Sequence, residues 1–293
     1  MKKTKMNRRA AIKTAAIGAS AAFVPLAYSN EGNASKNTPL KGNIRHSVCS
    51  WCYPHLSLDE LCLLAKDIGL VGIDLIGPEG WPTLKKHGLI STMCNGAELS
   101  LTEGFNHTEY HPQLIENYSR QIELVAAAGY TNLICFSGNR NGMDDETGLQ
   151  NCVAGLKQIL PLAEEKGVVI QMELFNSKVD HPDYMCDNTA WGIELCKRLD
   201  SPNFKLLYDI YHMQIEEGDI IRTIRENHRY FGHYHTAGVP GRHEIEENQE
   251  LFYPAIMKAI VETGYEGYVA QEFIPTREDP TESLRKAIAL CDV

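Results

Sequence analysis

The chain lacks three features that mark common functional classes: a basic surface, an apolar run long enough to cross a bilayer, and a glycine-rich phosphate loop. Its 293 residues include 28 Lys or Arg and 38 Asp or Glu, for a formal net charge of −10. Six of the basic residues lie in residues 1–30, which contain no acid, so the remaining 22 against 38 give −16. We therefore expect no nucleic-acid partner, because binding that backbone requires basic surfaces that displace counterions.

The N-terminal segment contains its own apolar stretch, from Thr14 to Leu26. It is too short for a membrane span, which needs about 20 residues. Basic residues precede it, and Asn7–Lys13 (NRRAAIK) resembles a twin-arginine export signal. We predict a signal peptide over residues 1–29, a polar linker over 30–43 and export, to the periplasm in a bacterium with two membranes. The alternative is a basic N-terminal segment without a targeting role.

Cysteine pairing is not expected to stabilise the fold, although the chain has nine cysteines beyond this segment. Several lie in apolar helical or strand runs, where free cysteine behaves as a small hydrophobic residue. Cys49 and Cys52 have C-x-x-C spacing, but no second pair stands nearby and they lie at a predicted strand end. We interpret the cysteines as reduced packing residues.

Short β-branched segments alternate with longer helical segments along the rest of the chain. Such alternation predicts parallel strands joined by right-handed crossovers, and eight strands predict a closed (β/α)8 TIM barrel, as one α/β domain over residues 44–293. An open doubly wound sheet is the alternative, but the phosphate loop of a dinucleotide fold is missing after the first strand. The predicted strands are His46–Trp51, Val71–Ile76, Leu89–Cys94, Asn132–Ser137, Val168–Phe175, Phe204–Tyr211, Tyr230–Thr236 and Gly267–Phe273. The predicted helices are Leu58–Ile68, Trp81–His87, Leu114–Ala128, Leu149–Lys166, Thr189–Leu199, Ile220–Glu226, Pro254–Glu262 and Thr281–Leu290.

Four polar residues stand near the ends of the last four predicted strands: Glu173, Asp209, His235 and Glu272. In a TIM barrel the carboxyl ends of the strands meet on one face, and the two-residue period of a strand allows each side chain to point to the axis. One such residue alone is more often a helix cap or an ion-pair partner. Four on consecutive strands predict a divalent metal site. Oxygen ligands and one imidazole favour Mn²⁺ or Mg²⁺, with Co²⁺ or Zn²⁺ also compatible.

Two segments carry a resemblance to a known family: Leu207–Asp219 (LYDIYHMQIEEGD) and Gly238–Glu244 (GVPGRHE). They resemble the YDxYHMQxxEGD and DVPGRHE blocks of the hydroxypyruvate isomerase family, within the xylose-isomerase-like barrel superfamily. The resemblance implies that Glu173 and Glu272 form a proton-shuttling pair and that Asp209 binds the metal. His235 departs from the glutamine of many hydroxypyruvate isomerases and matches related sugar epimerases. Gly238 replaces the usual Asp, and the glycine-rich turn expected after the second block is absent, so these departures bear on the substrate.

Residues near the predicted metal site are candidates for substrate contacts. The Arg242 guanidinium suits a carboxylate or vicinal oxygens, and His212 could hold a substrate hydroxyl or support a metal ligand by a hydrogen bond. Tyr211 and His233 share strand faces with predicted ligands and are expected to pack or support them. The acids Glu216, Glu217 and Asp219 are expected to start a helix. The predicted substrate-binding residues are His212, Arg242, Glu244, Asn95 and Trp51.

Together these features predict a metal-dependent isomerase that interconverts a small hydroxy-aldehyde and hydroxy-ketone by glutamate-mediated proton transfer through an enediolate. The alternatives are a ketose 3-epimerase, a lyase or dehydratase acting on an oxidised sugar, and a non-catalytic periplasmic sugar-binding barrel. A metallonuclease is disfavoured, because it would require more histidine ligands and a less acidic surface. The expected partner is a small hydroxy-carbonyl or sugar substrate, and a homo-oligomer is compatible with the sequence.

Overall fold

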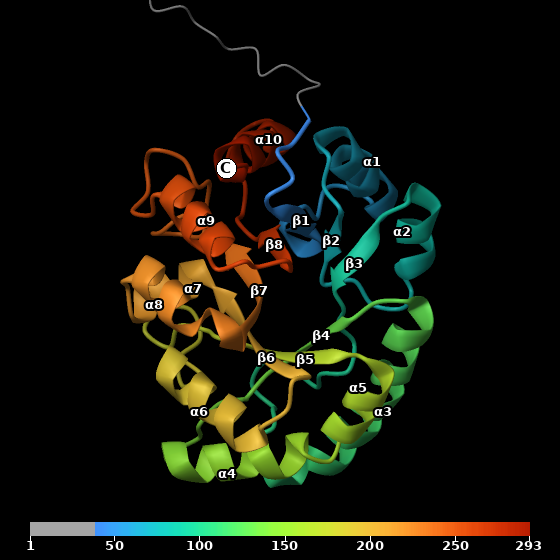
Figure 1. Cartoon of the computed structure of the whole chain (residues 1–293), viewed down its shortest axis with the longest axis vertical. Coiled ribbons are helices and arrows are strands. Elements are labelled where there is room, and N and C mark those ends of the chain that lie inside the picture. Colours follow the sequence, from blue (N-terminus) through green and yellow to red (C-terminus); the bar gives the residue numbers. More distant parts are fainter. Residues whose placement is uncertain (1–38) are drawn as a thin grey trace, which may run out of the picture. The chain divides into compact units, whose positions relative to one another are not determined.

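Eight parallel strands form the centre of the computed structural model, which describes residues 39–293 (Figure 1). Neighbouring strands follow the order β3-β2-β1-β8-β7-β6-β5-β4. The circle closes between β3 and β4, where Cys94 N donates to Asn132 O at 2.9 Å and Ile134 N donates to Cys94 O at 3.0 Å. The predicted TIM barrel is confirmed. The strands are β1 (Arg45–Cys49), β2 (Gly72–Asp74), β3 (Ile90–Met93), β4 (Asn132–Cys135), β5 (Val169–Glu173), β6 (Phe204–Asp209), β7 (Phe231–Thr236) and β8 (Tyr268–Gln271).

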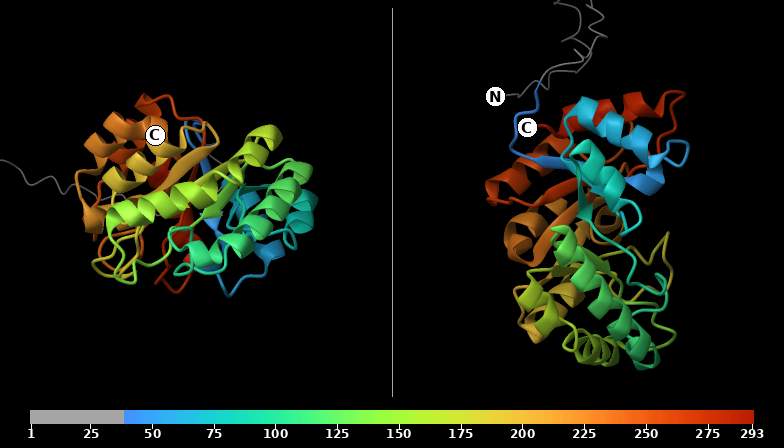
Figure 2. Two further views of the ribbon diagram at one scale, coloured as in Figure 1. Left: turned by 90° about the horizontal axis from the view of Figure 1, so that it is seen from below. Right: turned by 90° about the vertical axis from the view of Figure 1, so that its right-hand side faces the viewer.

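Helices surround the strands on the outside of the barrel, as Figure 2 shows from two further directions. Three of them, α1, α2 and α6, have the predicted bounds. The helices are α1 (Leu58–Ile68), α2 (Trp81–His87), α3 (His111–Ala128), α4 (Asp145–Leu156), α5 (Leu160–Lys166), α6 (Thr189–Leu199), α7 (Ile210–Glu216), α8 (Ile220–Asn227), α9 (Tyr253–Glu262) and α10 (Pro280–Cys291), with short 3₁₀ turns η1 (Ser50–Cys52), η2 (Thr108–Tyr110) and η3 (His228–Tyr230).

Helix α1 illustrates how local sequence fixes these bounds. The Ser57 hydroxyl accepts a hydrogen bond from Glu60 N, and the Glu60 carboxylate accepts one from Ser57 N at 2.8 Å, which forms a capping box. Gly69 ends the helix at φ +94°, a left-handed conformation that glycine adopts without strain.

Two predicted elements are wrong. The single helix predicted over Leu149–Lys166 is two helices, α4 and α5, because Pro161 lies in the first turn of α5 and cannot continue a preceding helix. The strand predicted to reach Tyr211 ends at Asp209, whose carboxylate caps α7 by accepting from Tyr211 N at 2.8 Å and His212 N at 3.3 Å. Tyr211 therefore lies on a helix and does not share a strand face with Asp209.

The acids expected to start a helix are arranged differently. Glu216 is the last residue of α7, and Glu217 occupies its C-terminal cap. Asp219 does precede α8, but it has a φ of +48° and its side chain makes no capping hydrogen bond. The missed helix α7 explains this error, because it occupies residues interpreted as the end of a strand and a loop.

All nine cysteines are free and buried, which confirms their role in packing. None of the helices from residue 39 onward is long and apolar enough to cross a membrane. The predicted signal peptide, and the predicted linker up to residue 38, lie outside the described residues.

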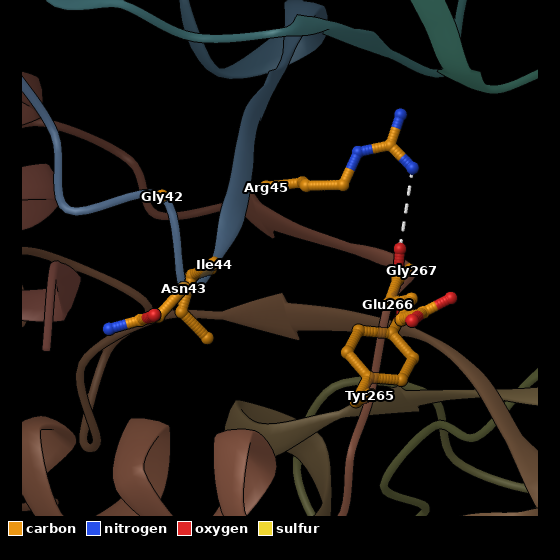
Figure 3. A pocket seen from close by; sticks show the side chains of 7 residues that line it. All are labelled: Gly42, Asn43, Ile44, Arg45, Tyr265, Glu266 and Gly267. Carbon is orange, nitrogen blue, oxygen red and sulfur yellow. Dashed lines mark hydrogen bonds between the residues drawn. The ribbon is translucent and has the colours of Figure 1, made fainter.

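A pocket of about 310 Å³ lies at the amino end of the barrel strands (Figure 3). The segment 42–45 at the start of β1 and residues 265–267 before β8 line it. Arg45 crosses its edge and donates from Nη1 to Glu266 O at 3.3 Å and from Nη2 to Tyr268 Oη at 2.8 Å. The four predicted metal ligands belong to the opposite ends of the strands, so this pocket is separate from their site.

Candidate metal centre and active site

The four predicted metal ligands come together at the carboxyl end of the barrel. Glu173 and Asp209 are the last residues of β5 and β6, His235 is the penultimate residue of β7, and Glu272 follows β8. One ligand atom of each lies within 4.8 Å of the corresponding atoms of the other three. All four side chains are buried. Parallel pairing of β5 to β8 produces this convergence, because it brings the carboxyl ends of four consecutive strands side by side.

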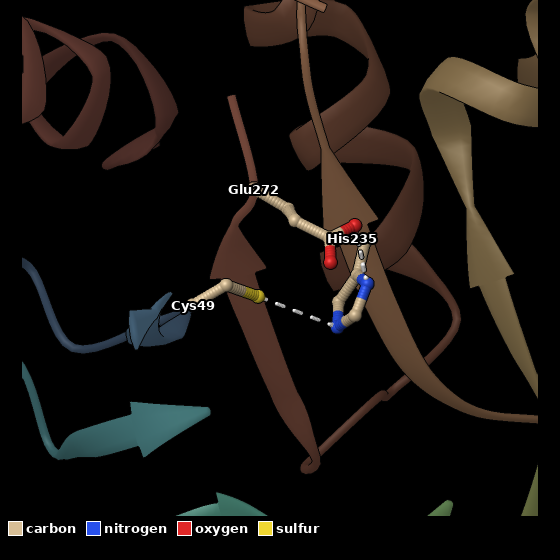
Figure 4. A group of neighbouring side chains, drawn as sticks. All are labelled: Cys49, His235 and Glu272. Atoms are coloured by element: carbon tan, nitrogen blue, oxygen red, sulfur yellow. Dashed lines mark hydrogen bonds and ion pairs between the residues drawn. The ribbon is translucent and has the colours of Figure 1, made fainter. Parts of the chain in front are cut away.

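The His235 ring lies between two sets of partners. Its Nδ1 is 2.8 Å from Glu272 Oε2 and 3.2 Å from Glu173 Oε1, so this nitrogen faces the carboxylate cluster. Its Nε2 lies 2.8 Å from Asp74 Oδ2 and 3.8 Å from Cys49 Sγ, on the other side of the ring (Figure 4). The candidate ligand atom of His235 is therefore Nδ1.

Arg242 also reaches the cluster. Its Nη2 is 3.1 Å from Asp209 Oδ2 and pairs closely with Glu272 Oε2. Its guanidinium carbon lies 5.3 Å from the ring centroid of Trp51 and 5.1 Å from that of Tyr211. Two aromatic rings and two carboxylates thus hold the Arg242 guanidinium at the site. Its predicted contact with the substrate stays a prediction.

His212, from α7, lies beside Arg242 and is completely buried. Its Nε2 is 2.9 Å from Arg242 Nη1, and its Nδ1 is 2.6 Å from Asn176 Nδ2. Asn176 in turn donates from Nδ2 to Asp180 Oδ2 at 2.7 Å. The sequence did not identify Asn176 or Asp180, and their only signal was their position in the segment that follows Glu173.

Of the three other predicted substrate-binding residues, Trp51 contacts the cluster, whereas Asn95 and Glu244 make contacts elsewhere. Trp51, in η1, donates from Nε1 to Glu272 Oε1 at 2.9 Å and is 44% exposed. Asn95 follows the end of β3, and its carbonyl accepts from Gln121 at 2.7 Å. The Glu244 carboxylate is directed to the segment after β8, where it accepts from Thr276 N, Thr276 Oγ1 and Ser283 Oγ, each at 2.8 Å. These contacts give Glu244 a structural role in that segment and do not bring it to the cluster.

Asp74 is a further residue that sequence reasoning missed. It ends β2, is completely buried, and contacts both His235 and His233. Burial opposes its ionisation, but the charges and hydrogen bonds of His233 and His235 hold its pKa well below the usual range. The available signal was an acid inside the apolar run VGIDLIG, the same kind of signal that identified Asp209.

The carboxylates of the cluster differ in acidity. Burial raises the pKa of Asp209 to about 8. The positive charge of Arg242 lowers this pKa, and repulsion from Glu272 raises it further. Burial likewise raises the pKa of Glu173. Glu272 is equally buried, yet Arg242 and His235 hold its pKa well below the usual range. Without an ion, a proton shared by the two glutamates therefore lies on Glu173 rather than on Glu272.

The donor set fits a divalent cation. Three carboxylates and one imidazole nitrogen lie close together and away from bulk water, where their mutual repulsion would be costly without a positive charge between them. Oxygen and imidazole donors suit Mn²⁺, Mg²⁺, Co²⁺ and Zn²⁺.

Comparison with known proteins finds one family model and several isomerases that this chain resembles. The family model described as xylose isomerase-like TIM barrel matches residues 82–292. The 2-oxo-tetronate isomerase of Pectobacterium atrosepticum is 26% identical over 72% of this chain and 84% of that protein. A putative hydroxypyruvate isomerase of Danio rerio is 32% identical over 46% of this chain and 49% of that protein, so the match spans about half of that relative.

Solved structures show the same fold. A family 2 AP endonuclease from Brucella melitensis has a TM-score of 0.73 and 23% identity, and the match covers 82% of this chain and 97% of that one. A 3-keto-D-glucoside 4-epimerase from E. coli has a TM-score of 0.72 and 20% identity, over 85% of this chain and 98% of that one. At these identities the two structures support the fold alone.

Proposed function

Because the chain belongs to the xylose isomerase-like TIM barrel family, we propose that it is a divalent-metal-dependent enzyme that moves a proton between adjacent carbons of a small hydroxy-carbonyl compound. Similar proteins are named isomerases, which supports an enzyme of the isomerase–epimerase class. The observation that carries the proposal is the convergence of Glu173, Asp209, His235 and Glu272, with ligand atoms within 4.8 Å of one another.

These four side chains would hold the metal, with His235 contributing Nδ1. Their donor chemistry favours Mn²⁺ or Mg²⁺, and Co²⁺ or Zn²⁺ fit the same ligands. A divalent ion bound there would act as a Lewis acid toward the carbonyl oxygen and the neighbouring hydroxyl oxygen of the substrate. This would make the C–H of the hydroxyl-bearing carbon more acidic.

Glu173 and Glu272 would carry the proton. An ionised glutamate would remove the proton from the carbon that bears the hydroxyl group, next to the carbonyl carbon, which leaves an enediolate. The second step returns a proton to the adjacent carbon, which gives isomerisation, or to the opposite face of the same carbon, which gives epimerisation. Both glutamates would be ionised while they hold the ion, because the ion displaces the proton that burial favours on Glu173. One of them would take the proton from the substrate, and the pair would then return it.

Arg242 and His212 would orient the substrate. The Arg242 guanidinium lies beside both Asp209 and Glu272, within reach of an oxygen on the reacting carbons. The His212 imidazole approaches the same guanidinium, so the two groups can bind one substrate oxygen together. Trp51 would cover the substrate at the mouth and donate to Glu272.

A ketose 3-epimerase, or a lyase or dehydratase acting on an oxidised sugar, is the second candidate. His235 stands where epimerases resembling this chain have histidine, and the segment after Arg242 departs from the hydroxypyruvate isomerase pattern. The proposed twin-arginine export also suits a scavenged sugar better than an intracellular metabolite. All of these reactions begin with removal of a proton next to a carbonyl group.

The test combines metal analysis of the purified protein with ¹H NMR of candidate hydroxy-carbonyl compounds in D₂O. We expect about one divalent ion per chain and deuterium incorporation at the carbon next to the carbonyl group, abolished by chelation and restored by Mn²⁺. Ligand binding without exchange in any compound would support a sugar-binding barrel and contradict the enzymatic proposal.

A further inference from the structure

Asp74 connects three barrel strands beneath the candidate metal centre. Its Oδ2 is 2.8 Å from His235 Nε2 and 3.0 Å from His233 Nε2. Its Oδ1 accepts from Thr92 Oγ1 at 2.5 Å. Both histidines belong to β7 and Thr92 belongs to β3, whereas Asp74 ends β2, so the carboxylate is held by groups on both sides of the barrel interior. Every one of these side chains is buried.

The contact with Asp74 fixes which nitrogen of His235 carries hydrogen. An ionised carboxylate only accepts hydrogen bonds, so Nε2 must be the protonated nitrogen of the ring. With Nε2 donating to Asp74, a bound ion would replace the proton on Nδ1, the nitrogen that lies 2.8 Å from Glu272 Oε2 and 3.2 Å from Glu173 Oε1. The same contact prevents a flip of the ring, because Nε2 would lose its only acceptor of good geometry.

His233 strengthens this arrangement. Its Nε2 donates to the same oxygen of Asp74, and its Nδ1 has no hydrogen-bond partner among residues 39–293. Within the described part of the chain, the His233 ring therefore makes one hydrogen bond, the one that holds Asp74 in place. Cys49 Sγ lies 3.8 Å from Asp74 Oδ2 and 3.8 Å from His235 Nε2, and Figure 4 shows the second of these contacts.

We propose that Asp74 is a positioning residue for the metal centre, which holds His235 with Nε2 protonated and Nδ1 directed at the ion. The inference rests on the proposed function, since it requires a divalent ion between Glu173, Asp209, His235 and Glu272. It extends that function to a carboxylate that touches neither the ion nor the substrate. Substitution of a residue that hydrogen-bonds to a metal-bound histidine typically lowers metal affinity by about 10–100-fold.

Two substitutions separate the roles of geometry and charge. Asp74→Asn keeps one oxygen acceptor for the two histidines but removes the charge, whereas Asp74→Ala removes both. We expect Mn²⁺ affinity, measured by isothermal titration calorimetry, to fall about tenfold in the first variant and about a hundredfold in the second. Glu244→Gln is the matched control, because it also removes a buried, hydrogen-bonded carboxylate but one that faces Thr276 and Ser283; its Mn²⁺ affinity should equal that of wild type.

A double-mutant cycle tests whether Asp74 acts through His235. Glutamine has no tautomers, so in a His235→Gln background Asp74→Ala should change Mn²⁺ affinity less than threefold. Equal losses in both backgrounds would show a general structural effect and overturn the proposal. Thermal unfolding of each metal-free variant separates loss of affinity from loss of fold.

A spectroscopic measurement on the wild-type protein does not depend on any variant. With ¹⁵N-labelled histidine and Zn²⁺ as a diamagnetic probe, long-range ¹H–¹⁵N spectra should show His235 coordinated through Nδ1 and protonated at Nε2. Coordination through Nε2, or two ions per chain with one lost on Asp74→Ala, would make Asp74 something other than a positioning residue and would overturn the proposal.

These outcomes also separate the two proposals. If the wild-type protein binds no divalent ion, the proposed function fails. If it binds one ion and Asp74→Ala binds the ion equally well, the proposed function stands and only the role of Asp74 is rejected.

Discussion

The Trp51 indole donates a hydrogen bond of 2.9 Å from Nε1 to Oε1 of Glu272, the last of the four candidate ligands. The same ring lies 5.3 Å from the Arg242 guanidinium carbon, and Arg242 pairs with the other oxygen of Glu272. One residue at the mouth of the barrel therefore supports both a proposed proton carrier and the cation beside it. Trp51 is 44% exposed, so this support adds little to the stability of the core.

We predict that Trp51→Phe lowers kcat/KM about tenfold or more while the melting temperature stays nearly unchanged. Phenylalanine keeps an aromatic face for Arg242 but removes the N–H, and a hydrogen bond to a charged group contributes about 1.5–3 kcal/mol. Steady-state kinetics and thermal unfolding measure the two effects.

Trp81→Phe is the matched control for this change. Trp81 also donates from Nε1, to Ile76 O at 2.9 Å, but it is buried in the packing of α2. Its substitution should lower stability and leave kcat/KM close to that of wild type. Wild-type kinetics in Trp51→Phe would contradict a catalytic contribution from its N–H.

The sequence predicted the convergence of the four ligands because two simple rules place them. Strand periodicity sets the direction of each side chain, and a closed parallel barrel brings the carboxyl ends of its strands to one face. Neither rule depends on long-range packing detail. Both rules apply to Glu173 and Asp209, which end β5 and β6, even though the ends of the predicted strands were displaced by two residues.

The remaining features depend on contacts that periodicity does not encode. The segment FKLLYDIYHM is mostly apolar, and a mostly apolar run does not distinguish a buried strand from a buried helix, so α7 was missed. Asp74 and Asn176 act on histidines more than 35 residues away in the chain, so their roles follow from barrel register. Glu244 was predicted to contact the substrate, but its carboxylate is directed to Thr276 and Ser283, which lie more than 30 residues further along the chain.

We predict that Glu173→Gln and Glu272→Gln each reduce turnover by about 10²–10⁴-fold, the usual range for general acid–base groups. Glutamine keeps the shape and an oxygen donor but cannot carry the proton. Deuterium exchange in D₂O, measured by NMR at saturating Mn²⁺, checks the result independently of product equilibrium. Metal content is measured in parallel because both residues are also candidate ligands, and an active double variant would refute the mechanism.

Metal affinity is expected to rise with pH. Burial raises the pKa of Asp209 to about 8 and also raises that of Glu173, so at neutral pH the metal-free site retains protons that the ion must displace. Below about pH 8 each unit of pH should strengthen Mn²⁺ binding about tenfold for every proton released. Calorimetry at pH 7 in buffers of different ionisation enthalpy counts these protons.

We expect the protein to release at least one proton for each Mn²⁺ ion that it binds at pH 7. Binding that releases none and has the same affinity at pH 6 and pH 8 would show that the carboxylates are already ionised, and it would contradict the raised pKa of Asp209.

The contacts of Glu244 predict a pH-dependent contribution to stability. Burial opposes its ionisation, but hydrogen bonds from Thr276 and Ser283 lower its pKa to about 2. Because the pKa is lower in the folded chain than in the unfolded one, ionised Glu244 stabilises the fold above about pH 4.5. That contribution is lost as pH falls from 4.5 toward 2.

We therefore expect Glu244→Gln to lower the free energy of unfolding by about 2 kcal/mol at pH 7, since it removes hydrogen bonds to a buried charge. The difference from wild type should shrink below pH 4.5, where the wild-type carboxylate contributes less. Urea denaturation at a series of pH values measures it. Glu246→Gln is the matched control, because Glu246 pairs with the partly exposed Arg277 and such pairs contribute at most about 1 kcal/mol. A Glu244→Gln effect that stays constant between pH 7 and pH 3.5 would show that the loss comes from altered packing and not from the charge.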